Sequence, residues 1–275
     1  MATNDGMRLD VWLVQHGYAG GREKAKELIA ADYVTVDGRP IKKASFSVAP
    51  AMTVVCTAPA PKYVGRGGYK LEKALALDGV SVDGAMCMDV GASTGGFTDC
   101  MLQRGAAHVY AVDVGHDQLH PTLRADARVT VLEGTDIRGE LLRAAIPVGS
   151  VTFCSVDVSF VSLSHVLPSV LPYLAADATL VCLIKPQFEA GAADVGKRGV
   201  VKDRRAHIRV LGQMLALFDG LHLTLTHLTF SPITGGEGNI EYLAVLGGSA
   251  APTVTDVASV VDEAHAGVKG KEKQR

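Results

Sequence analysis

Four charged residues stand where the neighbouring sequence is apolar or rich in glycine. Lys70 follows Gly67-Gly68-Tyr69 in an expected helix, Asp157 follows the apolar run 152–156, Lys185 closes the run 179–185, and Glu241 opens the run 241–246. A charge at the end of a buried strand is costly unless it is paired, and the carboxyl ends of parallel strands form the ligand-binding edge of a doubly wound sheet. We interpret the four as candidate catalytic residues. Structural ion pairs are the alternative, which stays open for Lys70 and Glu241 taken alone.

Two lysines and two carboxylates suit the removal of a proton from a weakly acidic hydroxyl, such as that of a ribose. Burial and a neighbouring positive charge both disfavour an ammonium ion, so that one lysine can act as a neutral amine base. Carboxylates hold the lysines in place and offset the remaining charge. If the electrophile in that reaction were a methyl group bound to sulfur, a site that holds the oxygen, the methyl carbon and the sulfur in line would contribute much of the rate acceleration. We assign Lys185 as the base and Asp157, Lys70 and Glu241 as orienting partners.

A glycine-rich segment, residues 91–96, joins the expected strand 86–90 to a helix. Glycine lets a backbone approach a ligand closely at such a junction, although a tight turn without a ligand would look the same. The expected strand 108–112 ends in Asp113, which suits the hydroxyls of a nucleoside ribose, and Asp136 follows the next run at a place that could face adenine. The expected cofactor-binding residues are Asp89, Gly91, Ala92, Ser93, Thr94, Gly95, Gly96, Phe97, Asp113 and Asp136.

The glycine segment matches neither Gly-x-Gly-x-x-Gly nor the Gly-Lys-Ser/Thr of a phosphate-binding loop, so a dinucleotide or a nucleoside triphosphate is disfavoured. Asp89 before Gly91 and Gly95 resembles the first motif of S-adenosylmethionine-dependent methyltransferases. That cofactor carries a sulfonium and an amino-acid moiety and has no phosphate to cradle.

Short apolar runs alternate with helical stretches from residue 85 onward. The expected strands are 86–90, 108–112, 129–133, 152–156, 179–185 and 241–246, and a helix is expected over 66–80. This alternation predicts an α/β fold with a mostly parallel sheet covered by helices on both faces. Residues 221–230 alternate strictly between apolar and polar, which predicts a strand that joins the last one in an antiparallel edge hairpin.

The N-terminal part predicts a small α+β unit. Helices are expected from Arg8 to Val14, before Gly17, and from about Gly21 to Ala31; Tyr33–Val36 predicts a strand, and Asp37-Gly38 a tight turn. Through residue 70 the chain has ten Lys or Arg against six Asp or Glu, although the whole chain has a net charge of −2. Such asymmetry suggests contact with a polyanion. The residues expected to contact it, which the resemblance given below assigns to RNA binding, are Arg8, Arg22, Lys24, Lys26, Arg39, Lys42, Lys43 and Arg66.

Composition narrows the remaining possibilities. We expect an RNA-binding domain over 1–56, a linker over 57–65 that is rich in Pro, Gly and Ala, a catalytic domain over 66–250, and a short helix with a frayed tail over 251–275. Five scattered cysteines without a C-x-x-C pair favour reduced thiols over zinc or disulfides, so we expect no metal. The polar N-terminus and the absence of a long apolar run predict a cytoplasmic protein without membrane contact.

These motifs together resemble a known family along almost the whole chain. Residues 7–50 resemble the S4-like RNA-binding module, with Asp32 where that module commonly has glycine, and residues 65–246 resemble the FtsJ-like ribose methyltransferase domain. The motifs Gly65-Arg66-Gly67-Gly68-Tyr69-Lys70-Leu71, 89–97 and Lys185-Pro186-Gln187-Phe188-Glu189 are similar to those of the TlyA (hemolysin A) family. The resemblance implies a Rossmann-like, seven-stranded, class I methyltransferase fold that uses S-adenosylmethionine.

The resemblance also implies an activity and its partners. It implies 2′-O-methylation of cytidines in ribosomal RNA, in the large subunit and in some members also in the small one, with a link to sensitivity to antibiotics such as capreomycin. It matches Lys70, Asp157, Lys185 and Glu241 to a Lys-Asp-Lys-Glu tetrad. Ribosomal RNA or a ribosomal subunit is the expected partner. A monomer is expected, although the sequence does not fix the oligomeric state.

Three alternatives remain at this point. The hemolysin name suggests a membrane-damaging protein, but the sequence has neither a secretion signal nor a membrane helix. A non-catalytic RNA-binding protein is disfavoured because all four tetrad positions are filled. A methyltransferase acting on base amino groups often has Asn/Asp-Pro-Pro-Tyr/Phe after the fourth strand, where this chain has Asp157-Val158-Ser159-Phe160.

Overall fold

The computed structural model describes residues 6–19, 21–58, 61–139, 142–248 and 256–272. Within it the chain forms two compact units that divide between Lys62 and Tyr63. The predicted linker 57–65 extends across this division, and the buried Tyr63 lies in the core of the second unit. Each unit has its own hydrophobic core, so we describe each by itself.

The first unit is an α+β fold in which two helices pack on short strands. Its elements are β1 (Met7–Arg8), α1 (Leu9–Gln15), α2 (Arg22–Ala30), β2 (Val34–Val36), β3 (Arg39–Pro40), β4 (Ser47–Val48) and β5 (Val54–Cys56). β2 pairs antiparallel with β3 and β5. Asp37 and Gly38 both have positive φ, which confirms the predicted tight turn. Asp32 also lies in the left-handed region, at φ 60, which explains why glycine suits this position.

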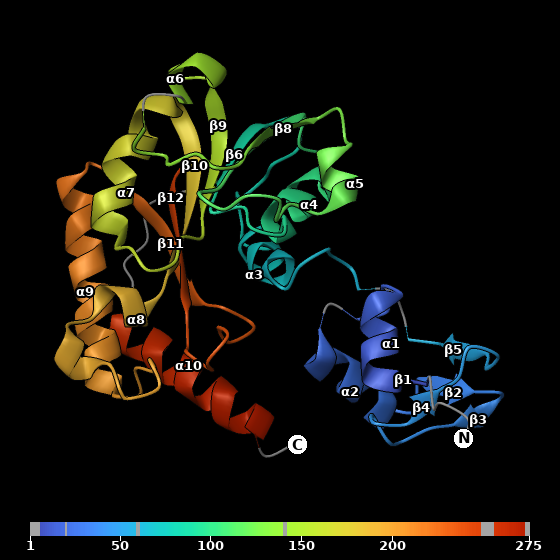
Figure 1. Ribbon diagram of the computed structural model, residues 1–275. Helices are drawn as coiled ribbons and strands as arrows, with labels where there is room; N and C mark the ends of the chain where they lie inside the picture. The colour runs from blue at the N-terminus through green and yellow to red at the C-terminus, as the bar shows by residue number, and fades with distance from the viewer. Residues whose placement is uncertain (1–5, 20, 59–60, 140–141, 249–255, 273–275) are drawn as a thin grey trace. The chain divides into compact units, whose positions relative to one another are not determined.

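The second unit is a seven-stranded sheet between two layers of helices (Figure 1). Its strands are β6 (Met86–Val90), β7 (His108–Val112), β8 (Val129–Leu132), β9 (Val151–Val156), β10 (Leu174–Ile184), β11 (Leu225–Phe230) and β12 (Tyr242–Gly247). Their order is β11-β12-β10-β9-β6-β7-β8, and β12 runs antiparallel to both of its neighbours. The predicted mostly parallel sheet and its late antiparallel hairpin are therefore confirmed.

Apolar side chains cover both faces of this sheet. One core contains residues of α6 (Leu142–Ala145), α7 (Leu163–Val170), α9 (Arg204–Gly220) and α10 (Val257–Glu272). The other contains residues of α3 (Gly67–Ala74), α4 (Gly96–Gln103) and α5 (Pro121–Arg124). The short helix α8 (Pro186–Glu189) follows β10. Burial on two faces explains why the central strands read as continuous apolar runs.

The strand predicted over 179–185 begins at Leu174, and three further elements also differ in extent from those predicted. The helix predicted over 66–80 ends at Ala74, because tight turns follow and Gly79 has φ +72. The strand predicted over 221–230 begins only at Leu225, because α9 extends to Gly220 and His222 turns the chain at φ 58.

The last difference lies at the C-terminus. The predicted short helix is sixteen residues long and continues to Glu272, with residues 273–275 outside the described part. Val261 and Ala264 are buried in the core formed with α9, and this packing stabilises a helix that propensity alone leaves marginal.

Candidate active site

The four predicted catalytic residues meet at the carboxyl edge of the parallel strands. Lys185 Nζ lies 2.6 Å from Asp157 Oδ1, and Lys70 Nζ lies 3.8 Å from Asp157 Oδ2. Lys70 Nζ also lies 2.7 Å from Glu241 Oε2. The residues come from α3, the end of β9, the end of β10 and the start of β12, so the strand order brings together residues that are far apart in the sequence. We call this group the tetrad.

The tetrad is largely removed from solvent. Lys70, Lys185 and Glu241 are 9%, 7% and 3% exposed. Two ammonium and two carboxylate groups balance in charge, which offsets the high cost of burying each of them alone. Lys185 Nζ also donates to Ser159 Oγ at 2.8 Å.

The glycine segment packs directly against the end of β9. Gly91 has φ +85, and a Cβ atom added there would lie 2.5 Å from the carbonyl oxygen of Asp157. Gly95, at φ +93, begins α4, and a Cβ there would lie 2.3 Å from Leu123 Cδ1. These glycines therefore set how closely the segment approaches the neighbouring chain.

Asp89 lies beneath this segment and does not face a cavity. It is 0% exposed, and its two carboxylate oxygens accept hydrogen bonds from Thr98 Oγ1 at 2.7 Å and Ser155 Oγ at 2.9 Å. Burial raises the pKa of Asp89 to about 6, although both hydroxyl groups act in the opposite direction. The carboxylate therefore ties the strand to the first turn of α4.

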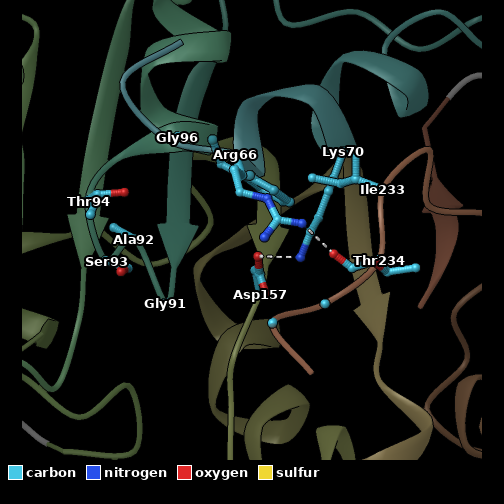
Figure 2. A pocket seen from close by; sticks show the side chains of 14 residues that line it. Arg66, Lys70, Gly91, Ala92, Ser93, Thr94, Gly96, Asp157, Ile233 and Thr234 are labelled. Carbon is cyan, nitrogen blue, oxygen red and sulfur yellow. Dashed lines mark hydrogen bonds and ion pairs between the residues drawn. The ribbon is translucent and has the colours of Figure 1, made fainter. Parts of the chain in front are cut away.

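Two cavities of about 240 and 360 Å³ meet at Gly91, Ser93 and Asp157. The first is lined by Arg66, Gly67, Lys70, Gly91, Ala92, Ser93, Thr94, Gly96, Phe97, Asp157 and the segment 233–236. Figure 2 shows Lys70 and Arg66 above Asp157, with Ser93 and Thr94 on the opposite side. The second cavity contains the predicted Asp113 and Asp136, together with the apolar Val112, Ile137 and Phe160. Asp89 and Gly95 line neither cavity.

Backbone and side-chain contacts fix the floor of the second cavity. Asp113 accepts hydrogen bonds from the backbone N–H of Ser93 and Gly115, each at 2.7 Å. Asp136 pairs with Arg138, which lowers the pKa of that carboxyl. Glu133, which the sequence did not single out, accepts from the backbone N–H groups of residues 117–119 and pairs with Arg124. These contacts order the loop that carries Gln118 into the cavity.

A loop before β12 covers the first cavity. Arg66 Nη2 donates to the carbonyl oxygen of Thr234 at 2.8 Å, as Figure 2 shows. A Cβ atom at Gly235 would lie 2.5 Å from Glu241 Oε1, so the loop lies directly on the tetrad. The sequence pattern gave no sign of this cover, since it depends on contact between segments distant in the chain.

Phe160 is a second feature that the sequence reasoning missed. Its side chain is 90% exposed, its φ is 64, and its ring centroid lies 5.1 Å from that of Phe188. Backbone strain and an exposed aromatic ring are both typical of functional surfaces. Glu189 supports this segment, since its carboxylate accepts from Ser162 Oγ and Leu163 N. The sequence signal that could have pointed to this residue is a phenylalanine next to Ser159, just after the end of a strand.

The predicted RNA-binding residues of the first unit are mostly engaged in ion pairs. Arg8 and Arg22 both bind the buried Asp10, which lowers the pKa of that carboxyl. Lys24, Lys26 and Lys42 pair with Glu27, Glu23 and Asp32. Within the described residues, the exposed Arg39 and Lys43 have no ion pair. Ion pairs as exposed as those of Lys24, Lys26 and Lys42 are weak. These three lysines can therefore exchange their carboxylate partners for phosphates readily.

A family model for FtsJ-like methyltransferases matches residues 63–248, and one for the S4 domain matches residues 7–54. The chain belongs to the FtsJ-like methyltransferase family. The match covers the seven-stranded unit with the complete tetrad, so the expected fold class is confirmed, and this FtsJ-like protein carries an S4 domain at its N-terminus.

Similar proteins align with this chain over most of their length. The chain is 42% identical over 276 residues to the protein YqxC of Bacillus subtilis, with 98% of each chain covered. It is 44% identical over 237 residues to the 16S/23S rRNA (cytidine-2′-O)-methyltransferase TlyA of Mycobacterium tuberculosis, with 86% of this chain and 87% of that one covered.

A solved structure agrees with these relatives. A protein described as a hemolysin, from Streptococcus thermophilus, superposes with a TM-score of 0.76 at 38% identity and covers 98% of this chain and 100% of its own. The resemblance to the TlyA (hemolysin A) family is thus confirmed. Among the described residues no helix has both the length and the apolarity that crossing a bilayer requires.

Proposed function

We propose that this protein transfers the methyl group of S-adenosylmethionine to the 2′-oxygen of a cytidine in ribosomal RNA. The observation that carries the proposal is the buried tetrad, in which Lys185 lies 2.6 Å from Asp157, and Asp157 lines both cavities of the glycine segment. The relatives named as rRNA cytidine-2′-O-methyltransferases support the choice of substrate.

The second cavity has the size and chemistry to hold a nucleoside. Its 360 Å³ lies within the range of small-molecule sites. In this proposal Asp113 binds the ribose hydroxyls, Asp136 and Ile137 border the adenine, and residues 91–96 hold the amino-acid end. Gly91 suits this role because a side chain there would meet the Asp157 carbonyl oxygen and push the segment away. The cofactor supplies an electrophilic methyl group on a sulfonium.

Lys185 is the proposed general base. Its neutral amine accepts the proton of the 2′-hydroxyl as the oxygen forms its bond to carbon. Asp157 holds Lys185 and also faces Lys70, and Glu241 fixes Lys70 from the other side. Ser159 gives the Lys185 amine a further fixed partner.

The basic residues of the S4 domain are proposed to bind the phosphates of the folded RNA. Such contacts position the RNA and make its binding salt-sensitive. Arg39, Lys42 and Lys43 lie around the β2–β3 turn and all three are exposed. Arg66, which holds the cover loop at Thr234, is placed to contact RNA next to the tetrad.

The decisive assay combines purified ribosomal subunits, labelled S-adenosylmethionine and the full chain. We expect the label to map, by alkaline resistance and mass spectrometry, to the ribose oxygen of a cytidine. A methyl group on a base would contradict the ribose assignment, and binding without any transfer would favour the non-catalytic alternative.

Lys185→Ala should lower the single-turnover rate by at least about 100-fold, the lower end of what a general base contributes. Lys185→Arg is the matched variant, since it keeps the positive charge but has a guanidinium that does not release its proton. We expect both variants to bind S-adenosylmethionine normally in calorimetry. Near-normal transfer by Lys185→Arg would show that charge, and not proton removal, is what the residue provides.

A further inference from the structure

A basic loop, residues 196–202, projects from the catalytic unit before α9. Lys197 and Arg198 occupy the centre of a turn that Gly199 N closes by donating to Gly196 O at 2.8 Å, and Gly196 N donates to Val200 O at 3.1 Å. Gly199 has φ +71, a backbone conformation that glycine adopts readily because it lacks a Cβ atom. Lys197, Arg198 and Lys202 are exposed. The turn therefore presents these cations on an ordered backbone.

The loop borders a cavity of about 380 Å³ that is separate from the two described above. The cavity also contains two carboxylates, and both are occupied: Asp194 pairs with Arg209, and Asp203 accepts from the backbone N–H of Arg205 at the start of α9. Across the part of the chain that the structure describes, the three loop cations have no ion pair. The rim of the cavity is thus positively charged and available to an anion.

Buried polar side chains tie this loop to residues 239–242, the segment that contains Glu241. Asn239, which is 3% exposed, donates from Nδ2 to Gly199 O at 2.9 Å and accepts at Oδ1 from Val201 N at 3.0 Å. His207 Nε2 donates to Val201 O at 2.9 Å, and its Nδ1 accepts from Tyr242 Oη at 2.8 Å. Asn239 and Tyr242 flank Glu241 in the chain. The backbone of the loop is therefore tied to the segment that leads into Glu241.

We propose that the 196–202 loop is a second RNA-docking surface, on which Lys197, Arg198 and Lys202 bind phosphates of the substrate near the target ribose. This rests on the proposed function, and it places phosphate contacts on the catalytic unit as well as on the S4 domain. Ordering before binding reduces the entropic cost of each contact. A membrane surface is disfavoured because the loop offers no exposed apolar side chain to insert: Val200 is half-buried and Val201 buried.

The test compares the full chain with its Lys197→Ala/Arg198→Ala variant. Binding is measured with purified large ribosomal subunits and with protein-free ribosomal RNA over a range of salt concentrations. We expect about a tenfold weaker affinity for both at low salt. The slope of log affinity against log salt should become shallower by roughly 1.4 to 1.8, as two lost phosphate contacts imply. Affinity for S-adenosylmethionine should not change.

Arg143→Glu is the matched control, because it changes the net charge by the same two units. Arg143 is exposed on α6, which precedes the amino end of β9, at the edge of the sheet opposite the tetrad. We expect this control to bind RNA almost as the wild type does. An equal loss in the control would mean that only the net charge matters and would overturn the proposal.

Two further outcomes bear on the proposal. Wild-type affinity and salt dependence in the double variant would contradict it, and so would a loss seen only with subunits and not with free RNA, which would point to a ribosomal protein. If the wild type binds RNA through this loop but transfers no methyl group, the docking surface stands and the proposed function fails.

Discussion

Asp89 is a completely buried carboxylate at the base of the glycine segment, where it binds Thr98 and Ser155. Its folded pKa of about 6 exceeds the ordinary value of 3.8, so the folded protein holds the proton more tightly than the unfolded chain does. The free energy of unfolding should therefore fall as the pH rises from about 4 to about 6 and should not change further through this group above that range. The contribution is about 3 kcal/mol.

The Asp89→Asn substitution removes the ionisable carboxyl group. Its side-chain amide can still form hydrogen bonds with the hydroxyl groups of Thr98 and Ser155. The variant should be more stable than the wild type near pH 7, and the difference in their unfolding free energies should grow by about 3 kcal/mol between pH 4 and pH 6. Urea denaturation at several pH values measures both. A difference that is constant over this range would show that Asp89 is not protonated on burial.

At the scale of elements, the active site depends on how closely the β6–α4 segment approaches the end of β9. Gly91→Ala would place a methyl group 2.5 Å from the Asp157 carbonyl oxygen, and the two segments would have to separate. We expect at least a tenfold weaker affinity for S-adenosylmethionine in calorimetry and a lower rate of transfer, because Asp157 carries the contacts to both lysines.

Gly149→Ala is the control that separates the steric effect of the Gly91→Ala methyl group from the effect of backbone strain alone. Gly149 has φ +71 but nothing within 4 Å of an added Cβ atom, so alanine there adds only the strain of a left-handed backbone, about 1–2 kcal/mol. Cofactor affinity should stay normal in this variant. Equal loss of affinity in both variants would attribute the Gly91 effect to general destabilisation.

On the scale of the whole molecule, the RNA contacts of the S4 domain and the binding of the cofactor belong to different units and should be separable. Arg39→Ala/Lys43→Ala removes two exposed cations of the S4 domain that have no ion pair within the described residues. The slope of log RNA affinity against log salt should become shallower by roughly 1.4 to 1.8, with unchanged affinity for S-adenosylmethionine.

Lys24→Ala/Lys26→Ala is the control within the same domain, since both lysines are paired with glutamates of their own helix. Its effect on the slope should be smaller, because each glutamate already offsets a lysine charge. A larger effect in this control would mean that RNA displaces the glutamates and binds the helix face directly.

The sequence alone determined the residue types of the tetrad, the glycine segment, the strands and the two-domain order. These features are local: apolar runs, turn residues and charges at strand ends follow from the chemistry of a few neighbouring residues. Lys185 and Asp157 could be paired in advance because the carboxyl ends of parallel strands share one edge of a sheet.

Only the tertiary structure decided which groups face one another. It turned Asp89 inward, laid residues 233–236 over Glu241, engaged Arg8 and Arg22 with Asp10, and tied the 196–202 loop to Asn239. It also extended α10, whose length depends on packing against α9. Each of these contacts joins segments whose meeting depends on strand order and core packing, and no local pattern of residues encodes that order.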